Sequence, residues 1–120
     1  ALGPKVLIAD DAAFMRMKSA QLLKELGHEV FEAENGEEAV SMFTEHSPDA
    51  VLLDITMPVM DGLEALKAIM AKDPNAKVAM VTAMGQQQVI MEAIKAGAKD
   101  FVVKPFDASR IEEALWKLVK

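Results

Sequence analysis

Short apolar runs alternate along the chain with longer segments in which apolar residues recur every three to four positions. The runs occupy positions 6–9, 50–53, 78–81 and 101–103. Uninterrupted runs of this length predict parallel β-strands that are covered on both faces. A further segment, 28–33, mixes polar and apolar residues and is therefore predicted to be an edge strand.

Amphipathic helices are predicted between these runs. Positions 15–26 carry one helical stripe, and Gly27 follows where a left-handed C-cap is expected. Two pairs, Asn35 with Glu38 and Asp61 with Glu64, have capping-box spacing. A fourth helix is predicted over 86–96 and a fifth from Asp107. The predicted core positions of the last four helices are Ala39, Val40 and Phe43; Leu66, Ile69 and Met70; Val89, Ile90, Ala93 and Ile94; and Ile111, Ala114, Leu115 and Leu118.

This strict alternation of strand and helix predicts an α/β fold. Successive parallel strands require right-handed crossovers, which place helices on both faces of the sheet. Five strands are too few for a closed barrel, so the sheet should be open and doubly wound. A length of 120 residues suits one domain, 1–120. Ligands of such folds bind beyond the carboxyl ends of the strands.

Composition narrows the classes of function. The net charge of −6 argues against a nucleic-acid-binding surface, and the absence of cysteine excludes disulfides and thiolate metal sites. The apolar runs are too short to span a membrane, and the chain shows no signal-peptide pattern. We therefore expect a cytoplasmic protein that binds neither nucleic acid nor membrane.

Chemically capable residues follow four of the predicted strands. They are Asp10 and Asp11, Asp54, Thr82, and Lys104 with Pro105. Three neighbouring carboxylates repel one another, so a compensating charge is expected. Oxygen ligands without His or Cys suit Mg²⁺ rather than zinc, and Lys104 can add a second positive charge. Taken alone, Asp10 and Asp11 could instead be a helix N-cap and a first-turn acid.

Asp54 is the candidate nucleophile in this group. A carboxylate can attack phosphorus and form an aspartyl phosphate, provided that a metal ion and a lysine neutralise the phosphoryl oxygens. The central strand would place Asp54 between the other two carboxylates and Lys104. Thr82 could then donate a hydrogen bond to a phosphoryl group once one is present, which makes it a candidate sensor.

The ordered set of motifs resembles the receiver domain of bacterial response regulators. It consists of Asp10-Asp11, Asp54 with Met57-Pro58 and Asp61-Gly62, Thr82-Ala83, and Lys104-Pro105, and the resemblance extends from Lys5 to Val119. The resemblance implies a flavodoxin-like, doubly wound five-stranded parallel sheet of order 2-1-3-4-5 with five helices. It also implies a signalling domain rather than an enzyme.

The resemblance implies a role for each site residue. Asp54 is the expected phosphorylation site. Asp10, Asp11, Asp54 and the backbone carbonyl of Thr56 are the expected metal site, for Mg²⁺ with Mn²⁺ as a substitute. Thr82, Phe101 and Lys104 are the expected switch residues, and Pro105 is expected to follow a cis peptide bond. Thr56 and Met84 are expected to tune the phosphoryl lifetime.

Within the family, the segments 10–16, 54–58, 83–87 and 96–101 are most similar to single-domain chemotaxis regulators of the CheY type outside enteric bacteria. This implies a monomer that receives phosphoryl from a CheA-like histidine kinase. Its face of helix 4, strand 5 and helix 5 would bind a flagellar motor switch protein. Phe101 stands where many chemotaxis members carry Tyr.

Two alternatives stay open at this point. The chain could be a phosphorelay intermediate or an isolated receiver of a larger regulator, with the same site chemistry and a different partner. It could also be a phosphatase with an aspartyl phosphate intermediate. The haloacid dehalogenase type, however, needs an acid two residues after the nucleophile, where this sequence has Thr56.

Overall fold

Five strands and five helices alternate in the computed structural model, which describes residues 3–83, 86–104 and 106–119. Their bounds are β1 Lys5–Ala9, α1 Ala13–Glu25, β2 Glu29–Ala33, α2 Gly36–His46, β3 Ala50–Asp54, α3 Gly62–Lys72, β4 Val78–Thr82, α4 Gln87–Lys95, β5 Asp100–Val103 and α5 Ala108–Val119.

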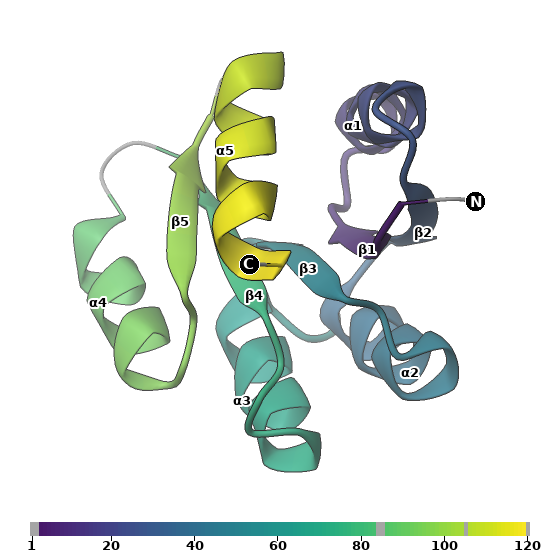
Figure 1. Cartoon of the computed structure of the whole chain (residues 1–120). Coiled ribbons are helices and arrows are strands. Elements are labelled where there is room, and N and C mark those ends of the chain that lie inside the picture. Colours follow the sequence, from purple (N-terminus) through teal and green to yellow (C-terminus); the bar gives the residue numbers. More distant parts are fainter. Residues whose placement is uncertain (1–2, 84–85, 105, 120) are drawn as a thin grey trace.

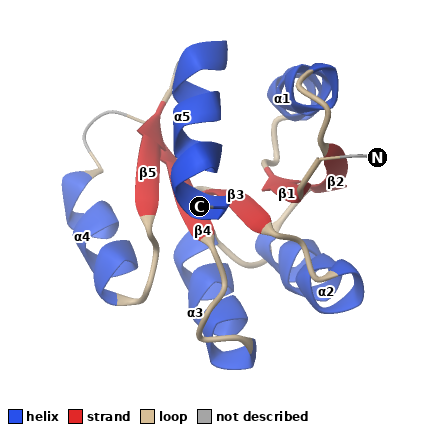
Figure 2. Ribbon diagram, viewed as in Figure 1, coloured by secondary structure: helices blue, strands red, loops and turns tan. Residues whose placement is uncertain are grey.

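The strands form one parallel sheet in the order β2-β1-β3-β4-β5 (Figure 1). Helices α2, α3 and α4 pack on one face, and α1 and α5 pack on the other, as Figure 2 shows. This confirms the predicted flavodoxin-like, doubly wound architecture. It also confirms 28–33 as the location of an edge strand, because β2 has a partner on one side only.

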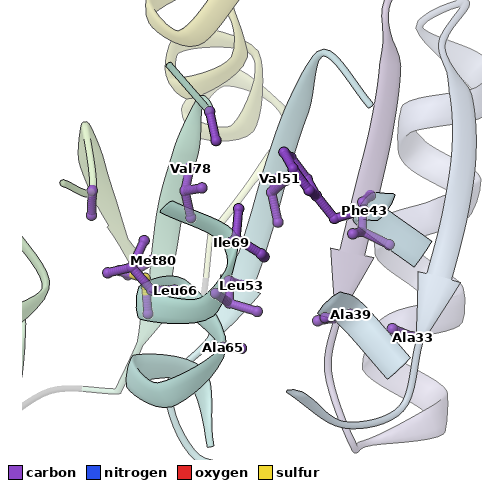
Figure 3. Close-up of a cluster of buried hydrophobic side chains, with 14 of the residues drawn as sticks. Ala33, Ala39, Phe43, Val51, Leu53, Ala65, Leu66, Ile69, Val78 and Met80 are labelled. Carbon is purple, nitrogen blue, oxygen red and sulfur yellow. The ribbon is translucent and has the colours of Figure 1, made fainter. Parts of the chain in front are cut away.

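The central strands are buried on both faces, which explains their continuous apolar runs. In β3, Val51 and Leu53 point into the cluster formed with α2 and α3 (Figure 3), whereas Ala50 and Leu52 point into the cluster formed with α1 and α5. Each buried leucine or valine side chain contributes about 2 kcal/mol to the hydrophobic driving force.

Helix starts and ends follow the predicted capping chemistry. Asn35 accepts a hydrogen bond from the backbone N–H of Glu38, and Asp61 accepts one from that of Glu64, each at 2.9 Å. The Glu38 carboxylate accepts from the backbone N–H of Glu34 rather than from that of Asn35, so this capping box is shifted by one residue. Gly27 follows α1 with φ of 93°, as expected for a left-handed C-cap.

The prediction that α4 and β5 bury their apolar side chains was partly wrong. Ile94 is 50% exposed, and Phe101 and Val103 are 36% and 38% exposed, whereas Val102 is buried. The physical reason is that β5 is the second edge strand and α4 covers only part of its face. Met91 of α4 is also exposed, so apolar side chains gather on two neighbouring elements.

Helices of the described residues are all too short or too polar to cross a membrane.

Candidate functional site

The sheet brings Asp10 and Asp54 together at its carboxyl edge. Ala9 pairs with Leu53 in the parallel register of β1 and β3, so the next residue of each strand lies at the same level. The chain crosses to β2 after β1 and to β4 after β3, in opposite directions, which makes this the switch point of strand order. One carboxylate oxygen from each of Asp10, Asp11 and Asp54 lies within 4.8 Å of the other two.

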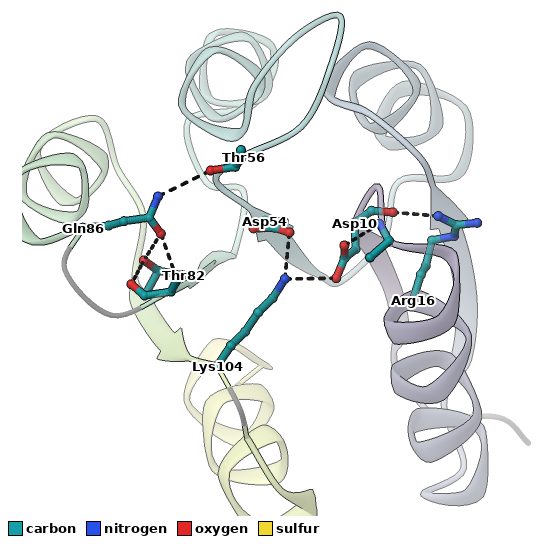
Figure 4. A network of polar contacts seen from close by, with 9 residues as sticks. Asp10, Arg16, Asp54, Thr56, Thr82, Gln86 and Lys104 are labelled. Atoms are coloured by element: carbon teal, nitrogen blue, oxygen red, sulfur yellow. Dashed lines mark hydrogen bonds and ion pairs between the residues drawn. The ribbon is translucent and has the colours of Figure 1, made fainter.

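Lys104 follows β5 and reaches back to two of these carboxylates. Its Nζ lies 2.9 Å from Oδ2 of Asp54 and 3.3 Å from Oδ2 of Asp10 (Figure 4). Both aspartates are buried, at 6% and 7% exposure, while Asp11 is exposed. Asp10, Asp11, Asp54 and Lys104 therefore lie together at the carboxyl edge of the sheet.

Burial dominates the ionisation of this group. It raises the pKa of Asp54, and the negative charge of Asp10 acts in the same direction, while the hydrogen bond and charge of Lys104 and a backbone hydrogen bond from Thr56 oppose the rise. Burial alone would lower the pKa of Lys104, but its hydrogen bond to Asp54 and the charges of both aspartates outweigh burial and raise it. The pKa of Asp54 and the pKa of Lys104 therefore each depend on the charge of the other group.

The raised pKa of Asp54 determines how the free energy of unfolding should change with pH. The unfolded chain loses this proton near the ordinary value of 3.8, and the native state loses it at higher pH. The free energy of unfolding therefore falls as pH rises from that value through the native pKa. In Asp54→Asn this loss is absent, so in EDTA the variant should gain stability relative to the parent as the pH rises above the ordinary value of 3.8. Urea unfolding checks this, and a difference that stays constant with pH would contradict it.

Asp10 is held by its neighbours rather than acting as a helix cap. Its Oδ1 accepts a hydrogen bond from the backbone N–H of Ala12 at 2.9 Å, and its carbonyl accepts one from Nη1 of Arg16 at 2.7 Å. The N-cap of α1 is Ala12, and the first turn of α1 contains no acidic residue. The alternative that Asp10 and Asp11 serve only as a cap and a first-turn acid is therefore wrong.

Arg16 is a positioning residue that the sequence did not single out. Besides the carbonyl of Asp10, its guanidinium contacts Glu32 at 3.4 Å and Glu34 at 3.5 Å, at and just after the end of β2. Only 12% of its side chain is exposed. Arg16 therefore ties the loop that carries Asp10 to the neighbouring strand.

Gly62 packs against the backbone of Asp54 and Ile55. Its N–H donates to the carbonyl of Ile55 at 2.8 Å, and a Cβ at this position would stand 2.0 Å from the backbone carbonyl oxygen of Asp54. The first turn of α3 thus packs directly on the backbone that presents the Asp54 carboxylate. The Asp61-Gly62 motif combines this close approach with the N-cap of α3.

Thr82 is fully buried at the end of β4, but its hydroxyl does not bond to Asp54 in this structure. It donates to Oε1 of Gln86 at 2.7 Å, and Phe101 of the adjacent strand remains partly exposed. No role was predicted for Gln86 beyond its place at the start of a helix. Met84 and Pro105, with the expected cis peptide bond, lie outside the described residues.

The donor set fits a hard divalent cation. Asp10, Asp11 and Asp54 supply carboxylate oxygens only, which is the chemistry that Mg²⁺ and Mn²⁺ prefer. Two of the three carboxylates are buried and one is exposed, so an ion held here could keep part of its hydration shell. These residues could therefore hold a metal ion.

Comparison with known proteins places this geometry in a family. A family model described as the response regulator receiver domain matches residues 6–116. The chain is 57% identical over 120 residues to the chemotaxis protein CheY of Thermotoga maritima, covering 99% of this chain and 100% of that protein. It is 61% identical over 117 residues to CheY of Listeria monocytogenes, covering 97% and 98%.

A solved structure has the same architecture. A chain of the CheX–CheY–BeF3–Mg²⁺ complex of Borrelia burgdorferi superposes with a TM-score of 0.92 at 37% identity, over 99% of this chain and 91% of that one. The family match, the two close relatives and this shared fold agree with one another. The protein belongs to the response regulator receiver domain family.

Proposed function

We propose that this chain is a single receiver domain whose Asp54 accepts a phosphoryl group from a histidine kinase. One observation carries the proposal: the buried Asp54 carboxylate lies between two further carboxylates and the ammonium group of Lys104. A carboxylate oxygen of Asp54 would attack phosphorus, the P–N bond to the kinase histidine would break, and the histidine nitrogen would keep the bonding electrons. The product is an aspartyl phosphate.

The surrounding residues suit that reaction. Asp10, Asp11, Asp54 and the carbonyl of Thr56 would hold Mg²⁺, which neutralises and orients the phosphoryl oxygens. Lys104 already contacts Asp54 at 2.9 Å and can follow the negative charge onto the phosphoryl group. The raised pKa of Asp54 reflects how poorly the unphosphorylated site tolerates its own charge. Binding of a cation would therefore be favourable.

The output surface would be the face of α4, β5 and α5. Met91, Ile94, Phe101 and Val103 expose apolar side chains on α4 and β5, and such patches mark interaction sites. Thr82 and Phe101 lie on the same side of the sheet, because Phe101 pairs with Met80, two residues before Thr82. Movement of Thr82 toward a phosphoryl group would therefore reach this surface directly.

The relatives indicate the pathway. Proteins that are 57–61% identical carry the name chemotaxis protein CheY, which supports a role for this chain in chemotaxis. We propose that it acts there as a cytoplasmic monomer. Its kinase would be CheA-like and its target a flagellar motor switch protein. Any catalysis would be limited to its own phosphorylation and dephosphorylation.

Metal removal tests the proposal. Acetyl phosphate labelled with ³²P should modify the protein once per chain in Mg²⁺, more slowly or not at all in EDTA, and again after Mg²⁺ or Mn²⁺ is restored. A heat-denatured sample controls for reaction with scattered nucleophiles. Labelling that is equally fast with and without metal would contradict the proposed site.

A further inference from the structure

The side chain of Gln86 turns away from the helix that it precedes. Gln86 is the N-cap residue of α4, yet its side chain makes no capping hydrogen bond. Its Oε1 instead accepts from the Thr82 hydroxyl at 2.7 Å and from the backbone N–H of Ala83 at 2.8 Å. Its Nε2 donates to Oγ1 of Thr56 at 3.4 Å (Figure 4). One amide group therefore connects the start of α4 to the end of β4 and to the loop that follows β3.

These ties matter because α4 has few stabilising features of its own at this end. Its first turn contains no acidic residue, and its N-cap side chain accepts no hydrogen bond from the backbone N–H groups of that turn. A helix start without caps or dipole compensation depends on tertiary contacts for its position. The contacts of Gln86 supply that anchorage, so a change in them would reach α4 directly.

Thr82 can satisfy only one acceptor at a time. A hydroxyl has a single hydrogen to donate, and that of Thr82 lies within reach of Gln86 Oε1 at 2.7 Å and of the Ala83 carbonyl at 3.0 Å. The proposed function requires the same hydrogen for a phosphoryl oxygen on Asp54. Donation to Gln86 and donation to the phosphoryl group therefore exclude each other.

We infer that Gln86 is a positioning residue that holds the Thr82 hydroxyl away from Asp54 until a phosphoryl oxygen competes for it. Release of Thr82 removes the shortest of the three contacts that the Gln86 amide makes, which weakens the anchorage at the start of α4. The exposed Met91 and Ile94 of this helix belong to the output surface. The inference rests on the proposed function and adds the element that opposes activation. Gln86 thus sets the balance between the two positions of Thr82.

This competition should change the affinity of the protein for a phosphoryl mimic in a direction that can be predicted. A contact made only in the unphosphorylated state lowers the affinity of that state for a phosphoryl mimic. Losing one hydrogen bond of ordinary net strength should therefore tighten binding of the mimic roughly three- to tenfold. Loss of the Gln86 amide should leave no buried polar group without a partner. Ala83 is exposed, so water can accept the hydrogen bond of its backbone N–H, and the buried Thr82 hydroxyl can still donate to the Ala83 carbonyl.

The test is a titration with beryllofluoride in Mg²⁺, followed by two-dimensional ¹H–¹⁵N NMR. Beryllofluoride is a tetrahedral mimic of a carboxylate-bound phosphoryl group. Gln86→Ala, and Gln86→Met, which keeps the length without the amide, should bind it roughly three- to tenfold more tightly than the parent. Gln88→Ala, the same kind of change at an exposed position of α4, should leave the affinity unchanged.

A double-mutant cycle separates the competition from a general effect on folding. In a Thr82→Ala background there is no hydroxyl to hold, so Gln86→Ala should no longer change the beryllofluoride affinity. Unchanged or weaker binding by both Gln86 variants, or an equal gain in the Thr82→Ala background, would overturn the inference. Failure of the parent to bind beryllofluoride in an Asp54-dependent way would instead overturn the proposed function, and the inference with it.

Discussion

Asp54→Asn is expected to abolish labelling of the protein by acetyl phosphate and by a phosphorylated histidine kinase. The asparagine amide is nearly the same size as the carboxylate, so the fold should be kept. The amide oxygen is a poor nucleophile, because its lone pair is delocalised and it carries no negative charge. Asp10 and Asp11 remain in the variant, so it tests whether position 54 alone accepts the phosphoryl group. Phosphoryl incorporation per chain is the measurement.

Asp73→Asn is the matched control for this variant. Asp73 follows α3 at the opposite edge of the sheet and accepts a hydrogen bond from the backbone N–H of Asn75, which an asparagine side chain can also accept. This variant should be labelled like the parent. Undiminished incorporation in Asp54→Asn would sink the assignment of Asp54, whereas loss in both variants would point to a general effect of the substitution.

Gly62→Ala is expected to cost about 3 kcal/mol of stability, or about 10 °C in melting temperature. The added Cβ would lie 2.0 Å from the carbonyl oxygen of Asp54 and 2.8 Å from the Cα of Ile55. Both obstacles are backbone atoms, which cannot rotate aside as a side chain can. Either the start of α3 or the end of β3 must therefore move, and the second change would misplace the Asp54 carboxylate. Thermal melting and the labelling rate measure the two consequences.

Gly27→Ala provides the comparison. Gly27 has φ of 93°, which an alanine adopts only with strain, but a Cβ there would meet nothing within 4 Å. The expected cost is therefore about 1 kcal/mol, with no change in labelling. If Gly62→Ala were no more destabilising than Gly27→Ala and labelled normally, the close packing of α3 on Asp54 would not support the site.

Much of the fold could be predicted from the sequence because its signals are local. Buried parallel strands need continuous apolar runs, and caps such as Asn35 and Asp61 act within one turn. The edge position of β5 could not be read in this way. Phe101 and Val103 look like core residues in the sequence, and only the strand order and the limited cover from α4 leave them exposed.

Some residues of the candidate site could likewise be predicted from the sequence, and others could not. Asp10, Asp54, Thr82 and Lys104 could be predicted together because parallel strands deliver their carboxyl ends to one edge. Arg16 and Gln86 could not be assigned roles in the same way. A long polar side chain can reach many partners, and the choice of the Asp10 carbonyl or the Thr82 hydroxyl depends on how the loops pack.

The position of the phosphoryl group on the chain tests most directly whether Asp54 is the phosphoacceptor. Borohydride reduces an aspartyl phosphate to homoserine, so the protein labelled with acetyl phosphate in Mg²⁺ can be reduced, digested and sequenced by tandem mass spectrometry. We expect homoserine at position 54 alone, and none in a sample that was reduced without labelling. Homoserine at position 10 or 11 with an unchanged Asp54 would contradict this assignment.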